Sequence, residues 1–439
     1  MKTLGIDIGT TSISGTIIDV LSGEQLDIKT ILNSTKISGQ PWSSEQDADQ
    51  IYRICQAMVE EFTQRWEDII GIGITGQMHG IVYLDGNGNL LSPLYTWEDG
   101  RGNLEYIDRM SYAEYLSEKT GYPMSTGFGL TTHFYNQING DVPQGGCKIT
   151  TIMDYVAMRL CGHHRPVMHV SNAASLGCFD LLASHFDSDA LARAGIDSGI
   201  LPDISEKEIV IGQTETGIPV VVAIGDNQAG IFGVVDDDSD VVVNIGTSSQ
   251  VSMTCSEPKK IADLECRPYV DGKYLLLGAG LCGGSSFGLL NDLFCQVCGM
   301  ASVEMSKEQM FSLMMEAAEQ VYKDGDCDNL QVRTLFRGKR NAPGIRGNIW
   351  NINMSNLTPG NLTLGFYKGV CEELYEAYQK MPAAQIGGKL FLCGNALRKN
   401  SLLRKVCGDI FSREVFLPKW KEEAAAGGAK LAISVLKNQ

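Results

Sequence analysis

The chain has 439 residues, more than one ordinary hydrophobic core supports, so two domains are expected. Hydrophobic residues make up 44% of it and charged residues 20%, which is typical of a soluble globular protein. The formal net charge of −16 argues against a nucleic-acid-binding surface, because such a surface needs an excess of Lys and Arg. The first residues contain no apolar run long enough for a signal peptide or a membrane span. We therefore expect a soluble, cytoplasmic protein that binds neither nucleic acid nor membrane.

In chain order, the first expected element is a β-hairpin over residues 4–19, LGIDIGTTSISGTIID. It consists of an apolar strand, an aspartate, a turn with glycine and threonine, and a second apolar strand. A helix is predicted over residues 48–66, and strands are predicted over residues 71–75 and 220–224. Strands that alternate with helices in this way indicate an α/β fold.

The second half of the chain repeats the first hairpin. Residues 241–253 read VVVNIGTSSQVSM, again a strand, a polar residue, a Gly-Thr turn and a strand. A strand is predicted over residues 389–393, and helices over residues 401–411 and 421–437. The glycine pair Gly427–Gly428 interrupts the last helical pattern, which indicates close packing and not a break in the helix.

An acidic run at residues 236–240 precedes the second hairpin, and we interpret it as a solvated connection between the halves. The predicted domains are therefore residues 1–235 and 236–439. The thirteen cysteines are scattered and are expected to be reduced. One CxxC pair, Cys295 and Cys298, lacks the second pair or the histidines of a zinc site, so core packing or a helix face is the better interpretation.

Both hairpin turns combine glycine with hydroxyl side chains. Glycine lets backbone N–H groups approach an anion, and the hydroxyls add donors, so such a turn can hold phosphate oxygens. Either turn alone is compatible with an ordinary hairpin, but two copies favour a pair of phosphate-binding turns. No Gly-Lys pair in the chain is followed by Ser or Thr as a P-loop requires, and no G-x-G-x-x-G follows the first strand.

Five motifs share one order along the chain. They are DIGTT at residues 7–11, GQMHG at 76–80, WEDGR at 97–101, GDNQAG at 225–230 and NIGTS at 244–248. Together they resemble the FGGY carbohydrate kinases, a family within the actin–hexokinase–Hsp70 superfamily, and the resemblance runs from Leu4 to the final helix. It implies two ribonuclease-H-like α/β domains, with ATP and a sugar bound in the cleft between them.

Further segments narrow the resemblance within the family. GQMHG and WEDGR resemble the ketose kinases and differ from the glycerol kinases. TGFG at residues 126–129, residues 154–166, SNAASLG at 171–177 and LPDI at 201–204 are most similar to the branch that phosphorylates sedoheptulose, with the xylulose kinases next. The resemblance thus implies transfer of a phosphoryl group from ATP to a terminal hydroxyl of a ketose, with Mg²⁺.

Two aspartates are candidates for the chemistry. Asp226 follows an apolar strand at the expected start of a helix, and the resemblance places it at the position of the catalytic base; the alternative is a plain N-cap. Asp7 ends the first strand, where a carboxylate can hold Mg²⁺ directly or through water. A buried aspartate that caps the turn is the alternative for Asp7, and both roles are compatible.

The sugar needs hydrogen-bonding side chains and one flat apolar wall. The resemblance assigns this role to Gln77, Met78, His79, Trp97, Asp99 and Asn227. Glu98 and Arg101 are left open between sugar contacts and solvated or ion-paired neighbours.

The nucleotide is expected at the two glycine-rich turns and after the strand at residues 389–393. The expected contacts are Thr10, Thr11, Gly246, Thr247, Gly394 and Asn395. Residues 283–285, Gly-Gly-Ser, are either the opposite wall of the adenine pocket or a simple turn.

Two other classes of protein share parts of this pattern. A nucleotide-driven chaperone or filament protein would share the hairpins but not the sugar motifs, and a catalytically silent sugar-binding regulator would not need Asp7 and Asp226 together. The sequence does not decide which ketose is bound, and a homodimer is compatible with it.

Overall fold

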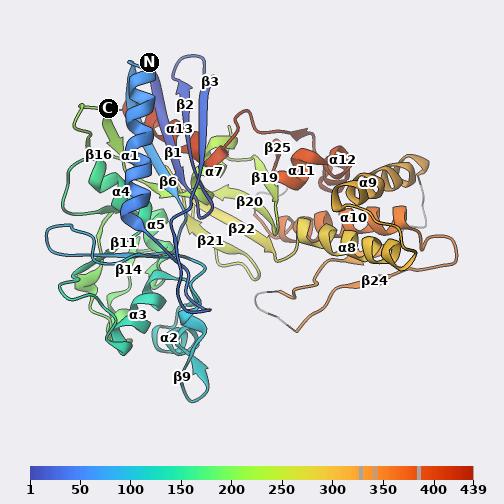
Figure 1. Ribbon diagram of the computed structural model, residues 1–439, viewed down its shortest axis with the longest axis horizontal. Coiled ribbons are helices and arrows are strands. Elements are labelled where there is room, and N and C mark those ends of the chain that lie inside the picture. The colour runs from blue at the N-terminus through green and yellow to red at the C-terminus, as the bar shows by residue number, and fades with distance from the viewer. Residues whose placement is uncertain (326–329, 340–341, 343, 383–386, 439) are drawn as a thin grey trace. The chain divides into compact units, whose positions relative to one another are not determined.

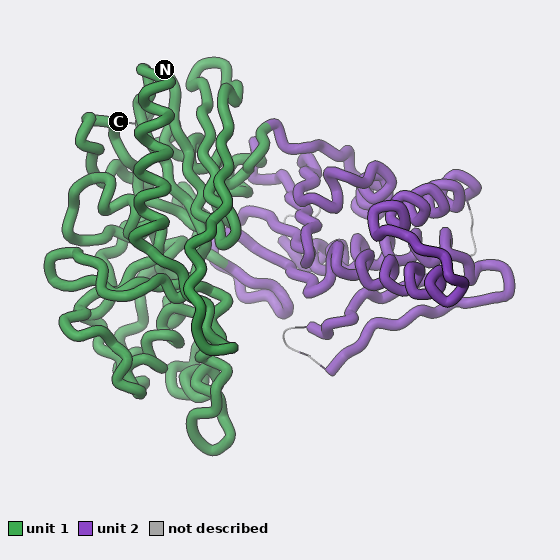
Figure 2. The backbone as a smooth tube through the Cα atoms, viewed as in Figure 1, with its two compact units in different colours: residues 1–234, 267–274, 420–439 green, residues 235–266, 275–419 purple. Residues whose placement is uncertain are grey.

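The computed structural model describes residues 1–325, 330–339, 342, 344–382 and 387–438. The chain divides into two compact units (Figure 2). Unit 1 comprises residues 1–234, 267–274 and 420–439, and unit 2 comprises residues 235–266 and 275–419. The units are discontinuous in sequence, because the end of the chain returns to unit 1. The division into two continuous domains near residue 235 stays a prediction.

Unit 1 is built on a mixed sheet with the strand order β16-β17-β6-β1-β2-β3, and β18 also pairs with β6. The strands are β1 (Lys2–Ile8), β2 (Ser12–Asp19), β3 (Gln25–Leu32), β6 (Ile69–Gly76), β16 (Val210–Gln213), β17 (Pro219–Val221) and β18 (Ile224–Gly225). β1 is antiparallel to β2 and parallel to β6. The first predicted hairpin is therefore confirmed, and the strand predicted over residues 71–75 lies within β6.

The strand predicted over residues 220–224 is divided in two. Val220 pairs with Ile72 and Ile224 pairs with Thr75, so four steps along one strand correspond to three along the other. One extra residue is therefore accommodated between β17 and β18, which is a β-bulge. The sequence pattern of apolar residues does not reveal it, because the bulged residues are also apolar and buried.

Unit 2 repeats the central part of this sheet. Its strands follow the order β22-β20-β19-β25-β26. They are β19 (Val241–Ile245), β20 (Ser249–Cys255), β22 (Tyr274–Gly280), β25 (Leu390–Cys393) and β26 (Val415–Phe416), and β21 (Glu265–Pro268) precedes β22. β19 is antiparallel to β20 and parallel to β25, as β1 is to β2 and β6. The second predicted hairpin is confirmed as well.

Helices cover the sheets, and short strand pairs complete unit 1 (Figure 1). The helices of unit 1 are α1 (Ala48–Arg65), α2 (Tyr112–Thr120), α3 (Gly129–Asn139), α4 (Ile152–Leu160), α5 (Val170–Ser175), α6 (Ser188–Arg193), α7 (Asp226–Val234) and α13 (Glu423–Lys437). Those of unit 2 are α8 (Gly284–Met300), α9 (Lys307–Asp324), α10 (Pro359–Tyr378), α11 (Asn395–Lys399) and α12 (Ser401–Phe411). The short pairs include β7 (Val82–Leu84) with β11 (Lys148–Thr150), β12 (Val167–His169) with β15 (Asp203–Ser205), and β5 (Glu45–Gln46) with β4 (Lys36–Ile37) and β8 (Leu94–Tyr95).

The two faces of the unit 1 sheet pack against different helices. Side chains alternate along a strand, so neighbouring residues of β1 face different helices. Leu4, Ile6 and Ile8 of β1 pack into the hydrophobic core that includes α1 and α4. Gly5 faces the other side, where α13 packs: a Cβ on Gly5 would lie 1.8 Å from the backbone oxygen of Ala425. The sheet and α13 can approach this closely only because β1 has a glycine there.

The glycine pair in α13 serves the same purpose. A Cβ on Gly427 would lie 1.8 Å from the backbone oxygen of Ala229 in α7, and a Cβ on Gly73 of β6 would lie 1.9 Å from the backbone oxygen of Gly428. The prediction of close packing without a helix break is therefore confirmed. α13 lies against β1, β6 and α7 together, and these are the elements that carry Asp7 and Asp226.

One expectation about the acidic run is wrong. Asp240 is only 3% exposed, and its carboxylate accepts hydrogen bonds from the backbone N–H groups of Asp236, Asp237 and Lys389. A short polar side chain that satisfies several backbone donors is stable when buried. The run therefore contains a structural cap, whereas residues 236–238 are exposed as predicted.

The CxxC pair lies on α8, where Cys295 and Cys298 are partly buried and pack against the core of unit 2. This agrees with the core-packing interpretation. Among the helices of the described residues, none combines the length and the apolar character needed to cross a membrane.

Candidate functional site

Asp226 is the first residue of α7, directly after β18. Its Oδ1 atom accepts a hydrogen bond of 2.7 Å from the backbone N–H of Asn227. Burial raises the pKa of Asp226 to about 6, although the Asn227 N–H and the charge of Arg267 act in the opposite direction. A carboxylate of this kind is ionised at neutral pH and still takes up a proton readily, as a general base must.

Asp7 lies on β1, paired with Ser14 of β2 and Thr75 of β6. Burial, together with the negative charges of Asp226 and Glu422, raises the pKa of Asp7 to about 8. Within the part of the chain that the structure describes, the buried Oδ1 atom of Asp7 has no hydrogen-bond partner. The carboxyl ends of β1 and β18 therefore carry two acidic groups that interact electrostatically.

Glu422, which sequence reasoning missed, precedes α13 in a left-handed conformation with φ 53°. Such a conformation is uncommon for a residue other than glycine. Its Oε1 atom accepts a hydrogen bond of 3.5 Å from Thr30 of β3. No motif marks this residue in the sequence.

The carboxylate oxygens of Asp7 are suitable ligands for a hard cation such as Mg²⁺. A buried carboxylate oxygen without a donor is costly, and a divalent cation would satisfy it. The described residues contain no group of three or more His, Cys, Asp or Glu side chains arranged to hold a metal. A cation at Asp7 would therefore take most of its ligands from water and substrate, which is how proteins commonly hold Mg²⁺.

The GQMHG loop follows β6, and its histidine is held in one orientation. His79 has φ 73°; its backbone N–H donates to Ser175 Oγ, and its Nδ1 lies 2.7 Å from the backbone oxygen of Ser175. A carbonyl oxygen only accepts, so Nδ1 carries the proton. The imidazole also stacks on Phe128, with ring centroids 4.7 Å apart and planes within 4°. Phe128 belongs to the TGFG segment, which explains why that segment accompanies the loop.

Thr10 connects the first hairpin to the sugar motifs. Its hydroxyl donates to Gln77 Oε1 at 3.4 Å and accepts a hydrogen bond of 3.0 Å from Trp97 Nε1. Gln46 also donates to the backbone oxygen of Thr10. The structure thus brings a predicted phosphate contact together with two predicted sugar contacts. Trp97 is 47% exposed, so a large part of its indole is available as an apolar wall.

Met78 links the same loop to Asp226, the predicted base. It is buried, and a Cβ on Gly225 would lie 2.5 Å from its sulfur atom. Gly225 immediately precedes Asp226, and Asn227 follows it. The predicted sugar residues Met78 and Asn227 therefore lie beside the predicted base.

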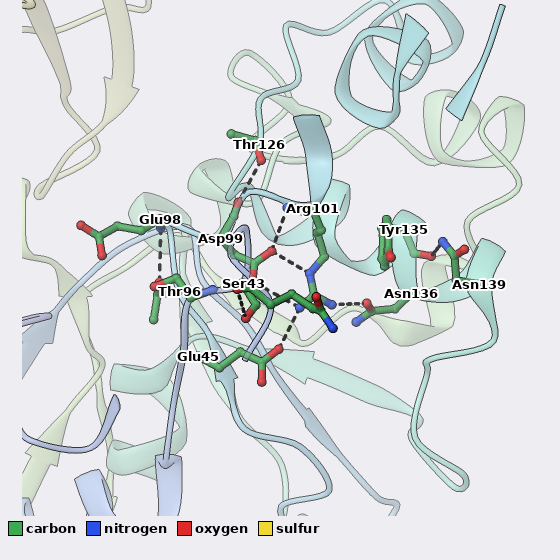
Figure 3. A network of polar contacts seen from close by, with 12 residues as sticks. Ser43, Glu45, Thr96, Glu98, Asp99, Arg101, Thr126, Tyr135, Asn136 and Asn139 are labelled. Atoms are coloured by element: carbon green, nitrogen blue, oxygen red, sulfur yellow. Dashed lines mark hydrogen bonds and ion pairs between the residues drawn. The ribbon is translucent and has the colours of Figure 1, made fainter. Parts of the chain in front are cut away.

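Asp99 and Arg101 form a buried ion pair (Figure 3). Asp99 is fully buried, and it accepts hydrogen bonds from Arg101 Nε at 2.7 Å, from the backbone N–H of Arg101, and from the backbone N–H of Ser44. Arg101 also pairs with Glu45 at 3.0 Å and donates to Asn136. Aromatic rings lie against its guanidinium group, with centroids at 4.3 Å for Tyr95, 5.4 Å for Tyr135 and 5.5 Å for Trp42.

For Arg101, the sequence left open a sugar contact or a solvated or ion-paired neighbour. This network shows that Arg101 is ion-paired in the core of unit 1. It also occupies both carboxylate oxygens of Asp99 with partners inside the protein. A sugar contact by Asp99 stays a prediction, and the contacts present give it a second role, because they fix the loop that carries Trp97. Gly127 allows that loop to approach: its φ is 79°, and a Cβ there would lie 1.9 Å from the Trp97 backbone oxygen.

In unit 2, the second glycine-rich turn lies against the start of α8. The backbone N–H of Gly284 donates to the Gly246 oxygen at 2.7 Å, and that of Gly283 donates to the Thr247 oxygen at 3.0 Å. At the other predicted nucleotide contact, Gly394 has φ 91°, and a Cβ there would lie 2.4 Å from Asn244 Oδ1. The turn of the hairpin, the start of α8 and the start of α11 with Asn395 therefore converge.

Two serines at the start of α8 add to this region. Within the described residues, the buried Oγ atoms of Ser285 and Ser286 have no hydrogen-bond partner. Ser285 belongs to the Gly-Gly-Ser stretch that the sequence singles out, whereas Ser286 was not predicted; the pattern Gly-Gly-Ser-Ser before an apolar helix was the available signal.

Comparisons with known proteins identify the family. The N-terminal domain of the FGGY family of carbohydrate kinases matches residues 2–233, and its C-terminal domain matches residues 241–435. The chain belongs to the FGGY family of carbohydrate kinases. It is therefore a transferase that uses ATP to phosphorylate a small-molecule sugar, and the two-domain α/β fold predicted from the motifs is confirmed.

Among its relatives, the sedoheptulokinase of Mus musculus is 27% identical over 443 residues, which cover 92% of this chain and 91% of that protein. The xylulose kinase of Staphylococcus epidermidis is 25% identical over 459 residues, which cover 98% of this chain and 87% of that protein. The crystal structure of a ligand-bound xylulose kinase from Lactobacillus acidophilus superposes with a TM-score of 0.81 at 20% identity, over 100% of this chain and 90% of that chain.

Proposed function

We propose that the protein transfers the γ-phosphoryl group of ATP to a terminal hydroxyl of sedoheptulose. The observation that carries the proposal is the pairing of a base with sugar motifs in unit 1: Asp226 begins α7, and Met78 of the GQMHG loop packs against the residue before it. The similarity to the sedoheptulokinase relative over most of both chains supports the choice of ketose. Xylulose and other pentuloses are less favoured alternatives.

Asp226 acts as the general base. The attacking hydroxyl must lose its proton as its oxygen bonds to phosphorus, and a carboxylate whose pKa is raised to about 6 accepts that proton at neutral pH. The N-terminus of α7 stabilises the ionised form before the transfer. Asn227, the next residue, is placed to contact the same part of the sugar.

Asp7 holds a magnesium ion, directly or through water. When bound, the ion would neutralise charge on the phosphate oxygens, and the unsatisfied Oδ1 atom of Asp7 is the feature of this chain that suits it.

The sugar is bound by the loops that follow β6 and β8. Gln77, His79 and Asp99 supply hydrogen bonds, and Trp97 and Met78 supply apolar surface. With Nδ1 protonated, His79 presents Nε2 as a hydrogen-bond acceptor in its neutral form, which suits a sugar hydroxyl.

The nucleotide contacts are assigned to the glycine-rich turns and to the start of α11. Gly246, Thr247, Gly394 and Asn395 contact ATP, and Thr10 and Thr11 contact its terminal phosphates. Backbone N–H groups in glycine-rich turns and the start of α8 are suited to anionic oxygens.

The experiment that tests the function is ADP release with Mg²⁺ and ATP, measured for sedoheptulose, D-xylulose, D-ribulose, L-ribulose, D-fructose and glycerol. A kcat/KM for sedoheptulose at least tenfold above that for each other sugar is expected. Preference for another sugar would refute the choice of ketose. No sugar-dependent turnover at all would favour a silent regulator or an ATPase of the same superfamily.

We place the reaction in the cytoplasm.

A further inference from the structure

A buried carboxyl group lies behind the proposed sugar site. Asp154 on α4 is 1% exposed, and no step of the proposed reaction uses it. Its Oδ2 atom accepts a hydrogen bond of 2.5 Å from Thr151 Oγ1. The amide nitrogen of Asn172 on α5 donates to both carboxylate oxygens, at 3.2 Å and 3.1 Å. A carboxyl group kept inside a core needs such hydrogen-bond partners to be tolerated there.

The Asn172 amide also reaches the strand that leads to Asp226. Its Nδ2 donates to the Ala223 backbone oxygen at 3.1 Å. Three acceptors therefore surround this nitrogen, so the amide orientation is fixed, since a flipped amide would place its oxygen against three other oxygens. Ala223 lies in the β-bulge between Val220 and Ile224, three residues before Asp226. A bulge changes the direction of the side chains that follow it.

The same helix holds the sugar histidine. Ser175, at the end of α5, donates from Oγ to the Asn172 backbone oxygen at 2.7 Å and accepts from the His79 backbone N–H at 3.1 Å. The Ser175 backbone oxygen accepts from His79 Nδ1 at 2.7 Å. α5 is thus attached at one residue to the bulge before the base and at another to the histidine of the sugar loop.

We infer that Asp154 is a positioning residue, which acts through Asn172 to place both Asp226 and His79. By holding the Asn172 amide, Asp154 fixes the bulge at Ala223 and the position of α5, and α5 fixes the orientation of His79. The inference rests on the proposed roles of Asp226 and His79. The alternative is that Asp154 and Asn172 stabilise the fold and do nothing specific for the reaction.

The test compares Asp154→Asn with an exchanged pair, Asp154→Asn with Asn172→Asp. Asp154→Asn places two amides against each other, so the melting temperature, kcat and the KM for the sugar should all worsen. The exchanged pair restores an amide–carboxylate contact but places a carboxylate oxygen against the Ala223 oxygen. It should therefore regain most of the melting temperature while kcat stays at least tenfold below wild type, with the KM for ATP within twofold.

The matched control is Thr150→Val, which changes a buried residue near the start of α4 whose hydroxyl has no partner in the described part of the chain. It should leave kcat and both KM values within twofold of wild type. Recovery of kcat together with the melting temperature in the exchanged pair would show that the contact is only structural and would overturn the inference.

If Asp154→Asn does not fold, Ser175→Ala tests the other branch. It removes the hydroxyl between His79 and Asn172 and leaves the backbone oxygen in place. The KM for the sugar should rise several-fold with little change in kcat, and an unchanged KM would overturn the inference for His79.

A readout without turnover separates this inference from the proposed function. The ¹⁵N spectrum of the imidazole groups, assigned with His79→Gln, should show the Nδ1-protonated form of His79 in wild type and a mixture of tautomers in Ser175→Ala and Asp154→Asn. An inactive wild type with this spectral change would refute the kinase function and support the positioning role. An unchanged His79 signal in an active enzyme would refute the positioning role alone.

Discussion

The two glycine-rich hairpins have the same surroundings in their respective units. In each, the first strand has an antiparallel partner on one side and a parallel strand on the other. The parallel strand, β6 or β25, leads directly into a loop with proposed ligand contacts, GQMHG after β6 and Gly394–Asn395 after β25. In each unit, the same backbone arrangement therefore places a proposed phosphate-binding turn beside a loop with proposed ligand contacts.

The hairpins differ in charge and in the length of the turn. Asp7 and Asn244 occupy equivalent positions, opposite Thr75 of β6 and Cys393 of β25. The last pairs before the turn are Ile8–Ile13 in the first hairpin and Ile245–Ser249 in the second, so the first turn is one residue longer. The backbone supplies N–H groups in both, but only unit 1 adds a carboxylate there. We therefore expect acid–base and metal chemistry in unit 1 and neutral hydrogen bonding in unit 2.

The largest expected effect comes from removing the base of unit 1. Asp226→Asn keeps the size of the side chain but cannot accept the proton, so kcat should fall about 100-fold or more, with the KM for ATP little changed. ADP release under saturating sugar and ATP measures this. Turnover above one tenth of wild type would mean that unit 1 does not supply the base.

The comparison also predicts which unit responds to acid. His133 of α3 in unit 1 is 4% exposed, its Nδ1 lies 2.8 Å from the Tyr83 hydroxyl, and burial lowers its pKa to about 4. The unfolded chain takes up this proton near pH 6.5, so the contribution of His133 to stability is complete above that pH and is lost as the pH falls to 4. The loss amounts to at most about 3 kcal/mol.

Urea unfolding of wild type and His133→Gln measures this contribution. The free-energy difference between the two proteins should shrink as the pH falls from 7 to 4.5. Measuring a difference is necessary because burial raises the pKa values of Asp7 and Asp154 to about 8, so both groups stabilise the protein as the pH falls. A constant difference for His133→Gln over this pH range would contradict the prediction.

Exchanging the polar residues of the two hairpins tests the comparison directly. Asp7→Asn gives the first hairpin the amide of the second. The Mg²⁺ concentration for half-maximal activity should rise about tenfold or more, and the melting temperature near pH 8 should increase because a buried carboxylate is removed.

Asn244→Asp places a carboxylate near phosphate oxygens, so ATP affinity should fall about tenfold by calorimetry with no change in sugar binding. Equal responses of both variants to Mg²⁺ would remove the distinction between the hairpins.

The sequence predicted the backbone better than it predicted the polar contacts. Both hairpins and the helix over residues 401–411 follow from local apolar periodicity and glycine content, and these signals lie within one element. In the bulge before Asp226, the Ala223 oxygen accepts a hydrogen bond from Asn172, which is distant in the chain. Asp240 likewise looks like a surface residue until Lys389 is brought beside it. Contacts between distant segments carry no local pattern, and one sequence alone does not reveal them.

The candidate site shows the same limit. Motifs placed Asp7, Asp226 and the GQMHG loop together, and the structure adds how they are held. The buried pair of Asp99 with Arg101 could not be distinguished from a sugar contact, because both roles require polar residues in a loop. Glu422 had no signal, since its proximity to the charge of Asp7 arises only when the end of the chain packs on β1.

The smallest expected effect concerns the connection between the first turn and the sugar motifs. Trp97 Nε1 donates to Thr10 Oγ1 at 3.0 Å, whereas Thr247, the corresponding residue of the second turn, accepts only backbone hydrogen bonds among the contacts described for unit 2. Trp97→Phe keeps an aromatic wall and removes this donor. Loss of one exposed hydrogen bond costs about 1 kcal/mol, so the KM for the sugar should rise about fivefold while kcat changes less than twofold. Thr247→Val is the matched change in the second turn, and it should raise the KM for ATP alone. If Trp97→Phe instead raised the KM for ATP and left that for the sugar unchanged, Thr10 would belong with the phosphate contacts only, and the two turns would be functionally alike.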